Sequence, residues 1–538
     1  MAVYSPTDAD AMHVALADQS VALAGNSPAE TYLDGKALIA AALTAGADAI
    51  HPGYGFLAEN ASFAQGVADA GLTWIGPSAD AISALGDKLA ARRIAAMVGA
   101  PLLASSDGPV GSVEEARAFV ARAGLPVIIK AQHGGGGRGM RVVRDLADLE
   151  RSFDSARREA KLSFGNDECF IERFLDNARH VETQCLADAY GNVAVLSTRD
   201  CSVQRRQQKL IEEAPAPFLT DLQVRALTKA SKGILSAAGY SGAGTCEFLV
   251  GADGEIAFLE VNTRVQVEHP VTEEVTGIDI IREMFEIAAG GRLSTTEPKQ
   301  RGHSIEFRIN AEDPAQGFRP TPGHIAEWKP AGGPGIRLDA GYGRGQSVPP
   351  NYDSLIAKLI VTGRDRQQAL ERAQRALAEF EIEGLPTTLG FHRAVVVHPD
   401  FVGTAGSGFR VHTKWVDELS AEFLQGIERQ GHAFDAARAG RGAGSLARPS
   451  IAGPSRNAAT KAAKAPGEIT APMTGTVIAV EAKVGARIEK GDIIVILEAM
   501  KMENLIVATA GGTVNEMALS VGDTVSIGDT ICVLTLVE

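Results

Sequence analysis

Apolar and polar residues alternate over the first hundred positions in a pattern that separates short strands from helices. Strand-like apolar runs at 2–4, 49–51 and 73–76 are interleaved with alanine-rich helical stretches at 35–45 and 62–70. Strands that alternate with helices are typical of an α/β layer with a parallel sheet. The pattern therefore predicts an α/β region at the start of the chain.

Longer apolar strands beside charged residues characterise the middle of the chain. Runs at 126–130 and 256–261 stand among polar turns, which predicts an α+β region from about 102 to 290. From 302 to about 415 the turns are rich in Gly and Pro, and a helix is predicted at 366–380. This part indicates a further mixed domain.

The segment 440–467 changes character. Nineteen of its twenty-eight residues are Gly, Ala, Ser or Pro, and none is acidic or aromatic. Because such a composition cannot bury a core, the segment is predicted to be a flexible linker.

The last seventy residues contain an internal repeat. The tripeptide at 475–477 recurs at 512–514, and the Gly-Asp pair at 491–492 recurs at 528–529, with an offset of 37 in both cases (512 − 475 and 528 − 491). Short alternating strands between Gly-Asp turns predict a small all-β domain with pseudo-twofold symmetry. Lys501 falls at the junction of the halves and is expected at the tip of a tight turn.

Composition excludes several functional classes. The chain of 538 residues has 52 Lys and Arg against 66 Asp and Glu, a net charge of −14, which argues against nucleic acid or an anionic membrane as the main partner. The five cysteines form no CxxC pair and indicate reduced thiols. Since no apolar run approaches the roughly 18 residues of a membrane span and no signal pattern is present, a cytoplasmic location is expected.

A glycine-rich stretch follows an apolar strand that ends in a lysine. Lys130 precedes Gly134, Gly135, Gly136 and Gly137. Glycines allow backbone N–H groups to close over phosphate oxygens, so the stretch predicts a nucleotide-phosphate loop. It lacks the GxxxxGK[ST] pattern of a Walker A loop, and a simple flexible hairpin is the alternative.

Two carboxylates and an amide stand on strands joined by a turn at 252–254. Glu247 lies on the first strand, and Glu260 and Asn262 lie on the second. Such groups are costly to bury without a cation, and hard oxygen ligands suit Mg²⁺ that bridges nucleotide phosphates. The alternative is an ordinary buried salt bridge.

Polar residues alternate with apolar residues directly after this pair of strands. Asn262, Arg264, Gln266 and Glu268 would share one face if the segment were an extended strand. Arg264 could then hold a small planar anion, and Glu268 could accept a proton from it. A solvated edge strand is the alternative.

A cationic run at 200–209 contains Arg205, Arg206 and Lys209. By itself it is most often a solvated basic turn. It gains interest because an anionic substrate needs positive charge in a protein that is acidic overall.

Together these motifs resemble the biotin carboxylase component of biotin-dependent acyl-CoA carboxylases, an ATP-grasp enzyme, joined to a biotin carboxyl carrier domain. The resemblance covers residues 2 to about 415 almost continuously. It rests on HPGYGFL at 51–57, the glycine-rich loop, RDCS at 199–202, EEAPAP at 212–217, EVNTR at 260–264 and the biotinylation motif EAMKM at 498–502.

The resemblance implies an α/β plus α+β architecture with five segments. These are a partial N-terminal α/β domain at 1–87, an ATP-grasp domain at 88–300, a C-terminal carboxylase domain at 301–438, the linker at 439–467 and an all-β biotinyl domain at 468–538.

The resemblance also implies roles for individual residues. ATP contacts are expected from Lys88, Lys130, Glu172, His180, Gln204 and the Gly134–Gly137 lid; Mg²⁺ or Mn²⁺ ligands from Glu247, Glu260 and Asn262; a bicarbonate pocket from Lys209, Arg264, Gln266 and Val267; a base from Glu268; and a cation for the biotin enolate from Arg308. The catalytic set is then Lys209, Arg264, Glu268 and Arg308, and biotin is attached to Lys501.

The implied activity is that of the α subunit of an acetyl- or propionyl-CoA carboxylase. ATP and bicarbonate would give carboxyphosphate, and the CO₂ released from it would be captured by biotin. The implied partners are a carboxyltransferase β subunit and a biotin protein ligase, and a homo-oligomer of the carboxylase region is expected. The acyl-CoA is not indicated by any motif.

Two departures from the family pattern stand out. The strand and helix that normally precede the 2–4 strand are not in the sequence, which places stability and dimerisation in question. Gln207 replaces the usual His of the RRHQK segment, and because Gln still offers a donor and an acceptor, weaker nucleotide contact is expected.

Three alternatives remain open at this point. The chain could be a biotinylated carrier whose carboxylase is impaired, or a different ATP-grasp ligase that joins a carboxylate to an amine. Lipoylation of Lys501 is also possible, although Met on both sides favours biotin.

Overall fold

The computed structural model describes residues 1–538 apart from 26, 107, 132–139, 165, 404–408, 421–422, 425, 428–466, 473–474, 500–501, 526–527 and 537–538. The glycine-rich loop, Lys501 and nearly all of the expected linker therefore lie outside the described residues.

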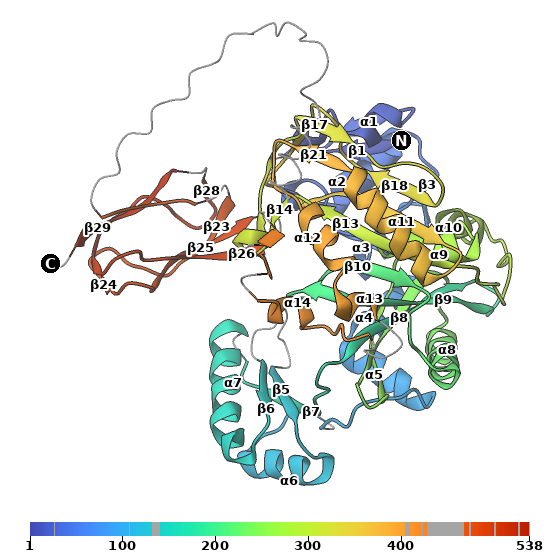
Figure 1. Ribbon diagram of the computed structural model, residues 1–538, viewed down its shortest axis with the longest axis horizontal. Helices are drawn as coiled ribbons and strands as arrows, with labels where there is room; N and C mark the ends of the chain where they lie inside the picture. Colours follow the sequence, from blue (N-terminus) through green and yellow to red (C-terminus); the bar gives the residue numbers. More distant parts are fainter. Residues whose placement is uncertain are drawn as a thin grey trace, which may run out of the picture.

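One antiparallel sheet of eight strands organises the carboxylase part of the chain (Figure 1). In spatial order its strands are β12 (Ile256–Asn262), β11 (Gly242–Val250), β8 (Arg179–Ala187), β9 (Val193–Arg205), β10 (Gln208–Ala214), β13 (His303–Asn310), β20 (Leu355–Gly363) and β18 (Ile336–Ala340). The middle strands are almost wholly buried because helices pack on both faces.

Alternation along β13 decides what each face of this sheet carries. Ile305, Phe307 and Ile309 point into the largest apolar core, where α11 (Arg366–Glu379) packs. Glu306 and Arg308 point to the other face, since successive side chains of a strand alternate. That face is covered by α9 (His269–Thr276), so charged residues lie beneath a helix.

A smaller sheet forms a separate lobe, drawn at the bottom of Figure 1. Its strands are β6 (Met140–Val143), β5 (Val127–Ala131) and β7 (Cys169–Arg173), covered by α6 (Val113–Ala123) and α7 (Leu149–Phe164). The lobe has its own apolar core, which includes Ile129, Phe153 and Ile171. The predicted strand at 126–130 is β5.

The N-terminal region confirms the expected parallel α/β pattern but divides it into two strand pairs. β1 (Ala2–Tyr4) pairs with β2 (Ser20–Ala22), and β3 (Ala49–Ile50) pairs with β4 (Thr73–Trp74). The helices are α1 (Met12–Leu16), α2 (Gly35–Thr44), α3 (Ala61–Asp69), α4 (Ala79–Gly86) and α5 (Lys88–Met97).

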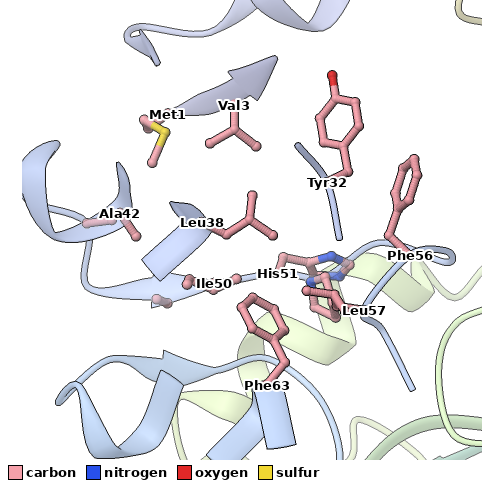
Figure 2. Close-up of a pocket in the computed structure, with 13 residues that line it drawn as sticks. Met1, Val3, Tyr32, Leu38, Ala42, Ile50, His51, Phe56, Leu57 and Phe63 are labelled. Atoms are coloured by element: carbon pink, nitrogen blue, oxygen red, sulfur yellow. The ribbon is translucent and has the colours of Figure 1, made fainter. Parts of the chain in front are cut away.

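A cavity of about 240 Å³ lies between these two pairs. Figure 2 shows Val3 of β1 on one wall and Ile50 of β3 on the other, with Leu38 and Phe63 from the helices α2 and α3. Most of the residues that line the cavity are apolar, and the two pairs form separate two-stranded sheets on its sides.

The C-terminal region is an all-β domain of two four-stranded sheets, red in Figure 1. One sheet contains β22 (Glu468–Thr470), β29 (Thr530–Leu536), β27 (Gly512–Met517) and β24 (Arg487–Ile488); the other contains β26 (Met502–Val507), β25 (Ile493–Ala499), β23 (Gly475–Val480) and β28 (Thr524–Val525). Strands β23 and β27 begin 37 residues apart (512 − 475), as do β25 and β29 (530 − 493). The predicted pseudo-twofold repeat is confirmed.

The remaining α-helices and strands of the described chain are one long helix, four shorter helices and three pairs of short strands. They are α8 (Asp221–Ala237), α10 (Ile280–Ala288), α12 (Leu389–Val395), α13 (Pro399–Val402), α14 (Trp415–Glu418) and the strand pairs β14 (Glu312–Asp313) with β15 (Arg319–Pro320), β16 (Gly323–His324) with β19 (Ser347–Val348), and β17 (Glu327–Lys329) with β21 (Glu381–Glu383). Across the described residues, no helix has the length and apolar character needed to cross a bilayer.

Candidate active site

A lysine ammonium joins three buried carboxylates on the central sheet. Lys209 of β10 donates to Glu182 of β8 at 2.7 Å and to Glu268 at 2.6 Å. It also donates to Glu247 of β11 at 3.2 Å. The segment 200–209 is a solvated turn only at Arg206 and Gln207, which are exposed between β9 and β10. The flanking strands are largely buried and carry Lys209 into the interior.

Glu268 is held between two cations. Its Oε1 accepts from Lys209, and its Oε2 accepts from Arg308 Nη2 at 2.8 Å. Burial acts to raise the pKa of Glu268, but Lys209 and Arg308 outweigh it and hold the pKa well below its ordinary value. The carboxylate is thus ionised, with one oxygen bound to each cation.

A buried arginine that sequence reasoning did not single out orients the Gln266 side chain. Arg199 is fully buried and donates through Nη2 to Gln266 Oε1 at 2.5 Å and through Nε to Glu182 at 2.5 Å. With its oxygen fixed in this way, Gln266 donates through Nε2 to Glu247 at 2.9 Å. Glu182 was also missed, although it stands two residues after His180 and therefore shares its strand face.

The predicted ATP contact His180 lies next to Glu247. The His180 Nε2 atom is 3.0 Å from Glu247 Oε2, and Gln204 Nε2 is 3.3 Å from His180 Nδ1. Burial acts to lower the pKa of His180, but the Glu247 carboxylate more than offsets this and raises it. The structure therefore brings His180, Gln204 and Glu247 together.

The expected metal donors converge on the two paired strands. Glu247 lies directly opposite Glu260 in the register of β11 and β12, and Asn262 ends β12. Burial and the neighbouring Glu247 charge raise the pKa of Glu260. Lys88, at the start of α5, is 3.7 Å from Glu260. Two facing carboxylates that repel each other beside an amide oxygen fit a hard divalent cation, which would relieve the repulsion.

The expectation of one extended face from Asn262 to Glu268 is wrong. β12 ends at Asn262, the next residues are irregular, and Glu268 is the residue that precedes helix α9. Pro270 lies in the first turn of that helix, where it requires no N–H partner. The bend still carries Gln266 and Glu268 to the site.

Arg264 is turned away from this group. It donates to Glu59 at 2.8 Å and to Asn262 Oδ1 at 2.9 Å. Val267 contributes its backbone carbonyl, which accepts from Lys358 Nζ at 2.9 Å. Of the expected bicarbonate residues, Lys209 and Gln266 both donate to Glu247 Oε1, whereas Arg264 lies on the Asn262 side.

Two expected ATP contacts pair on the smaller sheet. Lys130 Nζ donates to Glu172 Oε2 at 2.6 Å, and Arg92 Nη1 is 3.5 Å from the same carboxylate. Lys130 lies on β5, shortly before the glycine-rich loop in sequence, and Glu172 lies on the paired strand β7. They form a cationic group distinct from the Lys209 cluster.

These groups define a class of site. Alternating buried cations and carboxylates, beside paired donors that fit Mg²⁺, suit an anionic oxygen substrate activated by a metal–nucleotide complex. These are the features expected at the site of an ATP-dependent ligase on an ATP-grasp scaffold.

Comparison with known families matches most of the chain. Residues 1–82 match the biotin carboxylase N-terminal domain, 87–296 the carbamoyl-phosphate synthase L chain ATP-binding domain, 306–418 the biotin carboxylase C-terminal domain and 467–534 the biotin-requiring enzyme domain.

Relatives agree with these matches. The chain is 48% identical to the biotin-dependent acyl-coenzyme A carboxylase alpha3 subunit of Mycobacterium leprae over 98% of this chain and 93% of that protein. It is 49% identical to the biotin carboxylase of Nostoc sp. over 78% of this chain and 93% of that protein. The chain belongs to the biotin carboxylase–biotin carrier fusions that form acyl-CoA carboxylase α subunits.

Solved structures show the same fold. A biotin carboxylase from Campylobacter jejuni has a TM-score of 0.72 at 42% identity, with 78% of this chain and 92% of that chain covered. A single-chain, multi-domain long-chain acyl-CoA carboxylase has a TM-score of 0.65 at 34% identity. The matched region covers 100% of this chain and 48% of that carboxylase. The expected ATP-grasp carboxylase fold and biotinyl domain are confirmed, and the protein is an ATP-dependent biotin carboxylase that uses biotin, ATP and Mg²⁺.

Proposed function

We propose that this chain carboxylates biotin attached to its own Lys501, using ATP and bicarbonate, and that a separate carboxyltransferase subunit then transfers the carboxyl group to an acyl-CoA. The M. leprae relative is named as an α subunit, which supports a partner of that kind. The proposed domain boundaries are 1–87 for the partial N-terminal domain, 88–300 for the ATP-grasp domain, 301–438 for the C-terminal carboxylase domain, 439–467 for the linker and 468–538 for the biotinyl domain. We also propose that a biotin protein ligase attaches the biotin, that the carboxylase region forms a homo-oligomer and that the protein is cytoplasmic.

The observation that supports this proposal best is Glu268 between Lys209 and Arg308. The contacts of 2.6 and 2.8 Å leave a carboxylate beside two fixed cations. Bicarbonate that bound Lys209 and Gln266 would place its hydroxyl next to Glu268, which could accept the proton while the cations hold the anion. Bound Mg²⁺, held by Glu247, Glu260 and Asn262, would offset phosphate charge.

Replacing Glu268 tests the base. Glu268→Gln should reduce bicarbonate-dependent ADP release with free biotin by about 10²–10⁴-fold, because the acceptor is lost while the shape is kept. The affinity for Mg²⁺–ATP should stay within a small factor. Glu371→Gln, on the exposed face of α11, is the control and should release ADP normally. Undiminished turnover in Glu268→Gln would show that the base lies elsewhere.

The Lys501 prediction rests on the sequence. Lys501→Ala should abolish protein-bound biotin, measured by intact mass, while ADP release driven by free biotin continues. Lys490→Ala, an exposed lysine of the same domain, should remain biotinylated. Biotin retained in Lys501→Ala would refute the assignment.

Two alternatives predict different results in the same assay. An impaired carrier would be biotinylated and would bind ATP, yet show no bicarbonate-dependent ADP release. A carboxylate–amine ligase would release ADP only with an amine substrate and would not need Lys501.

A further inference from the structure

A buried acid that the proposed function does not use lies behind Arg308. Glu306 is fully buried on β13, two residues before Arg308 and on the same face. Neither of its carboxyl oxygens has a hydrogen-bond partner among the described residues. Buried polar atoms are rarely left in this state, so the group requires an explanation.

A second acid faces it across the strand pair. Glu212 of β10 is the register partner of Glu306, and directly opposite residues have Cβ atoms about 4.5–5.5 Å apart. Glu212 is also fully buried; its Oε1 accepts from Arg308 Nε at 2.5 Å, whereas its Oε2 has no partner in the described structure. Three of the four oxygens of this pair are therefore unpartnered.

The surroundings of the pair are apolar on one side and charged on the other. Ala214 of β10 and Ile360 of β20, next to the pair on the same sheet face, form a buried cluster with Val271 and Val275 of α9. The charged and titratable groups that act on Glu306 are Glu212 from β10, Arg308 from β13, Lys358 from β20, Glu268 before α9 and Tyr54 after β3.

The available cations cannot neutralise two charges on the pair. Arg308 already binds Glu268 as well as Glu212, and Lys358 Nζ donates to the Val267 carbonyl. Lys209 also acts on Glu212, but it donates to the three carboxylates of Glu182, Glu247 and Glu268. Burial raises the pKa of Glu306 well above its ordinary range and raises that of Glu212 to about 7. Two buried acids that face each other across a strand pair, with too few cations to neutralise both, do not both ionise near neutral pH.

We propose that Glu212 and Glu306 hold one shared proton and act as a positioning pair for Arg308. This proposal rests on the proposed function, because its consequence is felt at Glu268. With one proton the pair carries a single negative charge, which fixes the guanidinium between Glu212 and Glu268. Loss of the proton adds a second charge on the sheet side, draws Arg308 toward it and weakens the contact with Glu268.

The first measurement needs no turnover. Infrared difference spectra of the full-length protein between neutral and alkaline pH should contain the C=O band of a protonated buried carboxyl group. Comparison with Glu306→Gln should show that this band belongs to the pair, because Gln cannot ionise. Glu212→Gln should shift the band, and the control Glu371→Gln should leave it unchanged. A band unaffected by both pair substitutions, or no band at neutral pH, would overturn the proposal.

The second measurement links the pair to the reaction. Wild-type kcat/KM for free biotin should fall at alkaline pH with the same midpoint as the infrared band. Glu306→Gln mimics the protonated acid, so it should keep activity near neutral pH within about threefold and lose this alkaline fall. An unchanged alkaline fall in Glu306→Gln would refute the positioning role. A wild-type protein that shows the band yet releases no bicarbonate-dependent ADP would instead refute the proposed function.

Discussion

Individual buried charges in this protein are fixed by several partners each, and Glu213 is an example outside the reaction site. It is the neighbour of Glu212 and points to the opposite face of β10. Its carboxylate accepts from Arg366 at 2.6 and 3.1 Å and contacts His303 at 2.7 Å. Arg366 in turn donates to the backbone carbonyls of Phe401 and Val402, so one acid connects β10 to α11 and α13.

Glu213 should make the fold sensitive to acid. Burial acts to raise its pKa, but Arg366 and His303 outweigh burial and lower it to about 2, from 4.5 in the unfolded chain. A depressed pKa contributes stability above about 4.5 that is lost as the pH falls toward 2. Glu213→Gln should cost about 3–5 kcal/mol at neutral pH, because Arg366 loses its counter-ion. Urea unfolding at a series of pH values measures this; an acid dependence as steep as that of wild type would contradict it.

Sequence reasoning identified residues that carry their chemistry in a local motif. Glu268 and Lys209 were found in this way, His180 was implied by the family resemblance, and each lies in the cluster. Arg199 was quoted only as part of a motif, because its partner Gln266 is 67 residues away and no local pattern reports that contact. Arg264 was expected beside the substrate, yet Glu59, 205 residues away, binds it.

At the scale of elements, Arg308 depends on how α12 meets β13. The Arg308 carbonyl accepts from Thr388 Oγ1 at 2.8 Å and lies 2.6 Å from His392 Nε2. Burial lowers the pKa of His392 to about 4, so its ring is neutral and Nε2 carries the donated proton. Thr388 Oγ1 also accepts from the Asn310 N–H at 2.9 Å, at an irregularity in the pairing of β13 with β20.

Removing the Thr388 hydroxyl should loosen this junction. Thr388→Val keeps the shape but leaves the Asn310 N–H unpaired and the Arg308 carbonyl with one donor fewer, at a cost of about 1–3 kcal/mol in unfolding free energy. The KM for free biotin should rise as Arg308 becomes less well fixed. Thr387→Val is the control, since its recorded hydrogen bond is long at 3.4 Å. Equal stability of the two variants would show that the junction does not depend on Thr388.

Elements with a strong period were predictable, and their boundaries agree within a few residues. The helix expected at 366–380 is α11, and the expected strand at 256–261 is β12. The prediction of an extended strand over 262–268 failed because polar and apolar residues also alternate in an irregular bend, where some side chains point to the site and others into the core. The backbone there bends into helix α9, which has Pro270 in its first turn.

At the scale of the whole molecule, the C-terminal β domain has a core of its own. Among the residues that the structure describes, the buried cluster around Val477, Ile494 and Leu534 contains none from outside 469–534. The carboxylase cores likewise contain none of these residues. Separate cores predict separate unfolding transitions.

A core substitution in this domain should affect only one transition. Ile494 is fully buried, so Ile494→Ala should destabilise the β domain by about 2–5 kcal/mol. Calorimetry of the full chain should then show one transition moved to lower temperature and the carboxylase transition unchanged. If both transitions moved together, the domains would have to be energetically coupled.

The eight-stranded sheet runs without interruption through the position where the chain passes from the proposed ATP-grasp segment to the C-terminal carboxylase segment. β10 and β13 are hydrogen-bonded neighbours on either side of residue 300. Lys209 and Glu212 stand on one of these strands, and Glu306 and Arg308 on the other. Consider a chimaera that takes the chain before residue 300 from one relative and the chain after it from another. Its charge network would combine residues from two proteins that had diverged separately. Recombination during evolution should therefore pass these segments on as a single unit.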